Sequence, residues 1–183
     1  MIRRSFLALA CCTATLAACG FQLRGQQDYA FKRLAISGAP APVTARLTRM
    51  VQGGSDTVVV SSSANADAIL TMTEGRAQTV LTLNSLGVAS EYQLIYSLSY
   101  SLVGADGTVL LPPSVISLNR AMTYSDQFTL AKSQESDLLY ADMENDAVDQ
   151  LTRRLAVVRS LHPAPGQQAP AVAPRAPLPP PPL

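Results

Sequence analysis

The sequence predicts an α+β fold: a mostly antiparallel sheet of about four to five strands with two helices packed on one face, as a two-layer sandwich. Long central runs alternate apolar and polar residues, which is typical of strands with one covered face. Two other segments repeat apolar residues every three or four positions, as amphipathic helices do. Both ends of the 183-residue chain differ in composition from this middle, so we expect one folded domain over residues 29–162.

The first elements are a short strand, a helix and a second strand. Residues 29–37 form the first strand candidate, and residues 57–61 form the next. Between them, Pro42 suits the first turn of a helix and Gly53-Gly54 suits its end. The apolar positions of this helix fall on one face and are Val43, Leu47, Met50 and Val51.

Three longer strands are expected over residues 67–80, 91–103 and 114–124. Residues 81–90 are interpreted as the loop between the first two, and residues 104–107 as the hairpin turn between the last two. The final strand is expected to start after Pro112-Pro113.

Alternation divides the side chains of these strands between two faces. One face is apolar and carries Leu70, Met72, Tyr92, Leu94, Tyr96, Leu98, Tyr100, Leu102, Ile116, Leu118, Met122 and Tyr124. The other face carries small hydroxyl and amide groups in place of Lys and Glu, among them Ser97, Ser99, Ser117 and Asn119. The helices are therefore expected to cover the first face and to leave the second uncovered.

A second helix is expected over about residues 134–158. Its apolar face consists of Tyr140, Met143, Ala147, Leu151, Leu155 and Val158. Acidic residues lead and Arg153, Arg154 and Arg159 close it, which complements the helix dipole. Asp142, Asp146 and Asp149 could form a cation or acid/base site, but no calcium-loop motif is present, which favours a solvated helix face.

The N-terminus is predicted to be a lipoprotein signal peptide over residues 1–18. Arg3 and Arg4 precede an apolar stretch that is too short to span a membrane. Leu16-Ala17-Ala18-Cys19 resembles the bacterial lipobox, so Cys19 is expected to carry covalent diacylglycerol and an N-acyl chain, with no other cofactor. Because Gly20 replaces the aspartate that retains such proteins at the inner membrane, we expect an outer-membrane location.

Processing at this site changes the composition of the mature chain. Cys11 and Cys12 leave with the signal and Cys19 becomes a thioether, so no free thiol remains. Residues 19–28 then form a tether to the domain. Residues 163–183 hold nine of the thirteen prolines and are expected to form a disordered, extended tail.

Charge and motifs exclude several classes of function. The formal net charge is only +1, which argues against nucleic acid as a partner. The sequence has no nucleophile elbow, no phosphate loop, no dinucleotide motif and no zinc-protease motif, so a non-enzymatic protein is expected. Gly53 to Asp56 is interpreted as a connecting loop. His162 lies at the tail junction, where a catalytic base would be poorly held.

Four local motifs resemble the LptE family of outer-membrane lipoproteins. They are Cys19-Gly-Phe-Gln-Leu-Arg, Ala89-Ser-Glu-Tyr-Gln-Leu, Leu130-Ala-Lys and the helical run over residues 142–155. Their order and spacing match over about residues 19–160. The resemblance implies a plug in the lumen of the LptD β-barrel, in a one-to-one complex that helps barrel assembly and delivers lipopolysaccharide to the outer leaflet. The location implied is the periplasmic side of the outer membrane.

The polar open face agrees with this implication, because a barrel lumen is polar and accepts a hydroxyl-rich surface with few charges. Ser97, Ser99, Ser117 and Asn119 are therefore the candidate partner-facing residues. Two alternatives remain open at this point. One is a free-standing periplasmic lipoprotein that binds peptidoglycan or lipid, and the other is a hydrolase with an unrecognised carboxylate pair.

The resemblance also implies lipopolysaccharide contacts through basic residues. Lys132 matches one family position, in the Leu-Ala-Lys motif before the last helix. The loop before Glu91 has no cation, so Arg76 or Arg120 would have to replace it.

Overall fold

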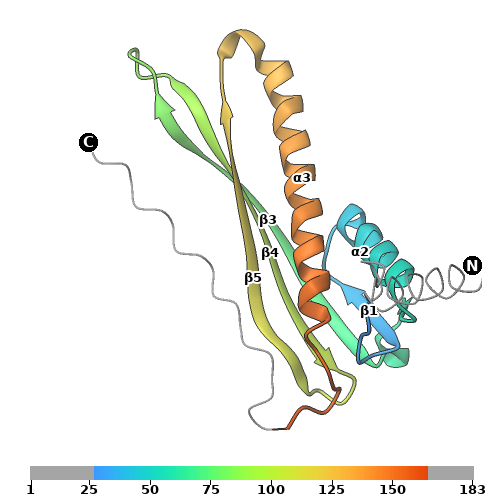
Figure 1. Ribbon diagram of the computed structural model, residues 1–183. Helices are drawn as coiled ribbons and strands as arrows, with labels where there is room; N and C mark the ends of the chain where they lie inside the picture. Colours follow the sequence, from blue (N-terminus) through green and yellow to red (C-terminus); the bar gives the residue numbers. More distant parts are fainter. Residues whose placement is uncertain (1–26, 165–183) are drawn as a thin grey trace, which may run out of the picture.

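A computed structural model describes residues 27–164, which form an elongated domain with one sheet and two helices on the same side of it (Figure 1). The signal peptide, Cys19, most of the tether and residues 165–183 of the predicted tail lie outside the described residues. The predicted α+β sandwich is confirmed.

The elements follow the predicted order. The strands are β1 (Arg33–Ser37), β2 (Val58–Val60), β3 (Ala68–Leu83), β4 (Ala89–Gly104) and β5 (Val109–Thr123). The α-helices are α2 (Ala41–Gly54) and α3 (Thr129–Leu155). Two 3-10 helices of one turn each are η1 (Ser63–Asn65) and η2 (Asp126–Phe128).

The sheet is mixed, with the strand order β2-β1-β3-β4-β5. β1 is parallel to both of its neighbours, β2 and β3, whereas the β3–β4 and β4–β5 pairs are antiparallel. β1 reaches only to Thr71 of β3, so beyond that point the sheet continues as three long strands. Sixteen residues of β3 extend about 50 Å, which gives the domain its length.

The core lies between the sheet and the helices, where the alternation predicted it. Buried strand residues include Leu70, Met72, Leu94, Tyr96, Leu98, Leu102 and Ile116. Buried helix residues include Val43, Leu47, Val51, Tyr140, Met143, Ala147, Leu151 and Leu155. The predicted apolar faces of both helices are therefore buried, with Met50 only partly so. Val158 is buried too, but it lies beyond the end of α3 at Leu155, so the predicted helix end at residue 158 was wrong.

The start of β5 differs from the prediction because an edge strand tolerates proline residues that a central strand does not. β5 begins at Val109 and includes Pro112-Pro113, so the predicted start at Ser114 was wrong. β5 is an edge strand, and its register with β4 shifts between the Tyr100 and Leu102 pairs, next to the prolines. Both conditions are those under which a sheet accommodates proline.

The remaining differences concern the ends of elements. α3 begins at Thr129, five residues before the predicted start, because η2 leads directly into it. The loop predicted over residues 81–90 shrinks to residues 84–88 as β3 and β4 continue pairing to Leu83 and Ala89. β1 starts at Arg33, four residues after the predicted start. The buried Phe31 precedes it, and the centre of its ring lies 5.3 Å from the centre of the stacked Tyr29 ring.

Candidate functional site

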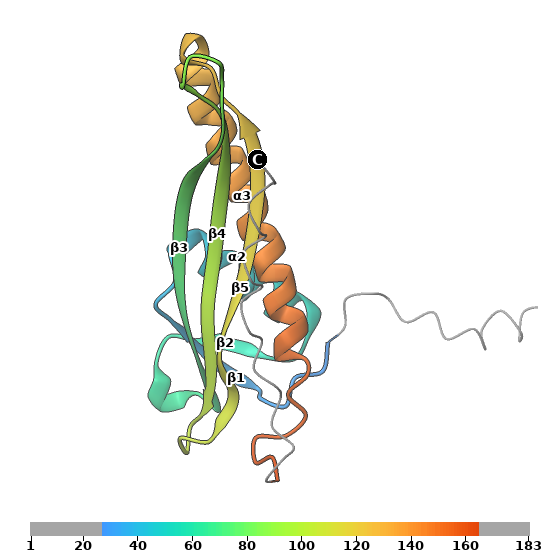
Figure 2. The ribbon, with the colours of Figure 1, turned by 90° about the vertical axis from the view of Figure 1, so that its left-hand side faces the viewer.

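The side of β3, β4 and β5 turned away from the helices is uncovered within residues 27–164, and we call it the open face (Figure 2). Its residues are Thr71, Thr73, Gly75, Ala77, Thr79, Glu91, Gln93, Ile95, Ser97, Ser99, Ser101, Val115, Ser117, Asn119, Ala121 and Thr123. Glu91 is the only charged residue among them, and its carboxylate accepts a hydrogen bond from Thr82 Oγ1 at 3.1 Å. The open face is thus a long, twisted surface that offers mainly hydroxyl, amide and methyl groups (Figure 2).

The four predicted partner-facing residues all lie on the open face. Ser97 of β4 stands directly opposite Ser117 of β5, and Asn119 stands opposite Ile95. Ser99, Ser117 and Asn119 are exposed, whereas Ser97 is half-buried and its hydroxyl donates to the Gly75 carbonyl at 3.3 Å. Their partner role stays a prediction, but the structure brings all four together on one surface.

Exposed apolar side chains gather at one end of the domain, which we call the distal end. The β3–β4 hairpin tip and the beginning of α3 both lie there (Figure 1). Eight of the eleven exposed large hydrophobic residues among 27–164 belong to it: Val80, Leu81, Leu83, Leu86, Val88, Phe128, Leu130 and Leu138. Exposed apolar surface of this kind marks an interaction site.

The sequence interpretation missed this cluster, although a signal was present. Residues 77–90 contain no charged residue, and apolar side chains occupy both alternation phases of the hairpin end. A hairpin with only one covered face would show polar residues in one phase. Leu86, at the turn, has the largest exposure of the group at 84%.

Lys132, the first candidate for a lipopolysaccharide contact, lies at the distal end, where its charge is already paired with a carboxylate. Its Nζ lies 2.8 Å from Glu135 Oε2 and donates to Thr123 Oγ1 at 3.1 Å. The side chain is 18% exposed, so the ammonium group is held between α3 and the end of β5. A phosphate at this position would have to share or displace the Glu135 carboxylate.

Arg120 and Arg76, the other two candidates, project to the helix side of the sheet. Arg120 pairs with Asp146 of α3 at 2.9 Å. Arg76 pairs with Glu74 and with Glu144 of α3. Arg76 precedes the loop at Asn84 by eight strand positions, or about 26 Å, so it does not stand at the hairpin tip.

The Arg76 ion pairs belong to a partly buried cluster between β3, β4 and α3. The Arg76 guanidinium lies 5.2 Å from the centre of the Tyr140 ring, and the Tyr140 hydroxyl donates to the Ala77 carbonyl at 2.7 Å. Burial raises the pKa of Glu144, and the neighbouring Arg76 opposes that rise. Two carboxylates share one guanidinium, so this cluster ties α3 to the sheet near the middle of the helix.

Two polar atoms of this cluster are buried without a hydrogen-bond partner among the described residues: Glu74 Oε2 and the Tyr96 hydroxyl. Burial, followed by the charges of Glu74 and Glu144, raises the pKa of Tyr96 well above its ordinary value.

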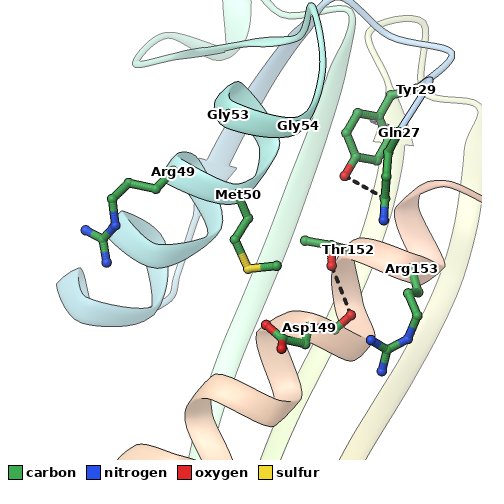
Figure 3. A pocket seen from close by; sticks show the side chains of 9 residues that line it. All are labelled: Gln27, Tyr29, Arg49, Met50, Gly53, Gly54, Asp149, Thr152 and Arg153. Atoms are coloured by element: carbon green, nitrogen blue, oxygen red, sulfur yellow. Dashed lines mark hydrogen bonds between the residues drawn. The ribbon is translucent and has the colours of Figure 1, made fainter. Parts of the chain in front are cut away.

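A pocket of about 550 Å³ lies between α2, α3 and the segment that enters β1 (Figure 3). Met50, Tyr29 and Thr152 line its interior, and Arg153 of α3 lies at its side, while the side chain of Arg49 of α2 points outward from it. Burial raises the pKa of Tyr29 to about 12. Arg46 reaches across from α2 to Asp149 of α3 at 3.0 Å, next to this pocket.

Other kinds of site find no support in the described part of the chain. Between residues 27 and 164, no three His, Cys, Asp or Glu side chains gather as metal ligands. No helix within that range combines the length and hydropathy required to cross a membrane. Cys19, the predicted lipid attachment site, lies outside it.

Comparisons with known proteins agree on one family. The model of the family described as "LptE: Lipopolysaccharide-assembly" matches residues 31–155. The solution structure of a lipoprotein B from Nitrosomonas europaea is similar, with 30% identity and a TM-score of 0.64, and the match covers 75% of this chain and 91% of that one.

Two crystal structures share the fold at lower identity. The rare lipoprotein B from Shewanella oneidensis has 22% identity and a TM-score of 0.58, with 68% of this chain and 93% of that chain covered. A minor lipoprotein from Acinetobacter baumannii has 16% identity and a TM-score of 0.56, with 72% and 96% covered. No curated protein sequence compared with this chain matches it.

Proposed function

This chain belongs to the LptE family, a non-catalytic family of lipopolysaccharide-assembly lipoproteins, and we propose that it plugs an LptD-type outer-membrane β-barrel. In this role it helps the barrel to assemble and takes part in delivering lipopolysaccharide to the outer leaflet. It is held on the periplasmic side of the outer membrane by acyl chains on Cys19.

The open face is the observation that carries the proposal. A surface of about 50 Å along the strands exceeds the roughly 30 Å hydrocarbon thickness of a bilayer, so it can follow a barrel wall across the membrane. Apart from Glu91 near the hairpin tip, its groups are uncharged hydroxyls and amides, which can be buried against a polar lumen without leaving an unpaired ion.

The ends of the domain fit the same role. Gln27, where the described chain begins, bonds through its N–H to the Gly54 carbonyl at 2.7 Å, at the C-terminal end of α2 and far from the hairpin tip (Figure 1). A chain anchored through the preceding residues and inserted in a barrel would direct its distal end toward the cell exterior. Exposed apolar residues there would contact the partner or the lipid in transit.

The proposal is tested by isolating the chain from detergent-solubilised outer membranes. We expect a one-to-one complex with the barrel. Replacing Ser99→Arg together with Ser117→Arg introduces two charges on the open face and should abolish that complex, because a buried unpaired charge costs several kcal/mol. The control pair, Ser61→Arg with Ser160→Arg, lies on exposed residues away from the open face and should leave it intact.

The free-standing alternative makes the opposite prediction. A chain that is recovered only as a monomer from membranes containing the barrel, or an open-face variant that still forms the complex at wild-type yield, would contradict the plug. The open-face and control variants must retain the wild-type unfolding temperature, which is expected because substitutions at exposed serines seldom change stability.

Lys132 is the proposed phosphate contact for lipopolysaccharide, because it is the one candidate cation beside the apolar distal end. Lipopolysaccharide combines phosphate groups with acyl chains, and this end combines an ammonium group with exposed apolar side chains. Arg76 and Arg120 remain proposed as auxiliary contacts, which would require them to exchange a carboxylate for a phosphate.

Replacing Lys132→Asp should weaken binding of purified chain to lipopolysaccharide, whereas Lys132→Arg should retain it, since a cation remains. Binding is measured by titration of labelled lipopolysaccharide. Unchanged affinity of the aspartate variant would remove Lys132 from the site.

A further inference from the structure

Charge is distributed unevenly along the domain. We define the proximal half as β1, α2, β2, the β4–β5 turn and α3 from Asp149 onward, together with the short segments that join or follow them; the rest is the distal half. The proximal half holds seven of the ten Lys and Arg residues between 27 and 164, and five of the thirteen Asp and Glu residues. The formal charges are therefore +2 for the proximal half and −5 for the distal half.

Ion pairing sharpens this asymmetry. Each distal cation, Arg76, Arg120 and Lys132, is paired with a carboxylate. In the proximal half, only Arg33 and Arg46 form such pairs. The basic residues of the described chain that form no ion pair all lie in the proximal half: Lys32, Arg49, Arg153, Arg154 and Arg159.

Two of these cations flank the pocket between the helices. Arg49 belongs to α2, with its guanidinium group pointing outward from the pocket, and Arg153 belongs to α3 (Figure 3). The only carboxylate lining this pocket, that of Asp149, is already bound by Arg46 at 3.0 Å. Arg49 and Arg153 thus carry unpaired charges on the exposed surfaces of the two helices, and the carboxylate that lines the groove is already paired with Arg46.

The start of the described chain lies at the same groove. Gln27 lines it and is held there by its bond to the Gly54 carbonyl. Only eight peptide units separate Gln27 from Cys19, and eight extended residues span at most about 29 Å. A bilayer that holds acyl chains on Cys19 would thus lie within reach of the groove.

We propose that the proximal surface of α2 and α3, with the exposed and unpaired cations Arg49 and Arg153, docks on a lipid surface and binds the phosphate groups of anionic phospholipids. The two guanidinium groups attract the headgroups, and the negative distal half is repelled from the same surface. The lipid surface then orients the domain with its hairpin tip pointing away. This surface is separate from the open face and does not depend on a barrel partner.

The experiment uses the full mature chain from residue 19, produced without acyl chains, and vesicles of phosphatidylcholine with or without phosphatidylglycerol. Co-sedimentation should show binding only to the vesicles with phosphatidylglycerol, and high salt should remove it. Since a basic residue near an anionic surface contributes about fivefold in partitioning, Arg49→Gln with Arg153→Gln should lower it about 25-fold.

The matched control is Gln134→Glu with Ala141→Glu, which changes the net charge by the same amount at exposed positions of the distal half. Its partitioning should stay within about twofold of wild type. The proposal is overturned if this control loses as much binding as the proximal pair, because net charge alone would then explain it. Equal binding to pure phosphatidylcholine, or binding only when lipopolysaccharide is added to the vesicles, would also overturn it.

Discussion

Tyr140 is the first fully packed residue of α3, and removing its hydroxyl should loosen one part of the domain selectively. Residues 129–139 are exposed or half-buried, whereas Tyr140 is only 8% exposed. Its hydroxyl donates to the Ala77 carbonyl at 2.7 Å, and its ring lies beneath the Arg76 guanidinium. These contacts attach the exposed first turns of the helix to the sheet.

The expected magnitude follows from those contacts. Tyr140→Phe keeps the ring, and with it the cation–π contact, but removes a neutral hydrogen bond worth about 1 kcal/mol. Tyr140→Ala also removes a large buried ring and should lower the free energy of unfolding by about 3–4 kcal/mol. The local opening of residues 129–139 should become about fivefold more frequent in the Phe variant.

Urea unfolding measures the global effect, and amide hydrogen exchange measures the local one. Tyr29→Phe is the matched control, because its hydroxyl bonds only to Gln27, at the other end of the domain. It should leave exchange at residues 129–139 unchanged. Uniform loss of protection along the whole of α3 in Tyr140→Phe, or no loss at residues 129–139, would refute the role assigned to this side chain.

Three other changes have distinct expected outcomes. Asp67→Asn removes a carboxylate whose pKa is lowered, chiefly by its bond to Arg33, so it should cost about 1 kcal/mol at pH 7 after allowance for solvent screening. The stabilisation from a lowered pKa is complete above the unfolded value of 3.8 and is lost as the pH falls through the lower folded value. The difference from wild type in urea unfolding should therefore shrink progressively below pH 3.8. Gly38→Ala should lower the free energy of unfolding by at least about 2 kcal/mol in a thermal melt, because φ is +86° and the new Cβ would lie 2.3 Å from the Met72 carbonyl oxygen. In the control Gly53→Ala the new Cβ meets no atom within 4 Å, so this variant should stabilise α2 slightly. Leu86→Glu should change the free energy of unfolding by less than about 0.5 kcal/mol, because the side chain is exposed, but it should lower the yield of the barrel complex in co-purification. A wild-type yield of that complex would show that the hairpin tip does not contact the barrel.

The layers of the fold could be predicted because alternation and helical spacing are local properties. Leu94, Leu98 and Leu102 on one side and Ser99 and Ser117 on the other fix which face of the sheet is buried. Strand neighbours depend on contacts distant in sequence, so nothing local indicated that β1 is parallel to both β2 and β3.

The candidate site was predicted only in part for the same reason. The open-face residues follow from strand phase, and all four lie where phase puts them. The carboxylate partners of Arg76 and Arg120 come from α3, many residues away in sequence, so their ion pairs could not be foreseen. The groove between α2 and α3 likewise forms only when the two helices pack together.

The central claim is that the open face packs against the wall of a barrel, and site-specific photo-crosslinking in outer membranes tests it most directly. A photoreactive residue at Asn119, which is exposed on the open face, should yield an adduct with the barrel protein. The same residue at Ser61, beside β2 and away from that face, should yield none. If the chain still co-purifies with the barrel but Asn119 yields no adduct while Ser61 does, the partner binds another surface and the plug account is wrong.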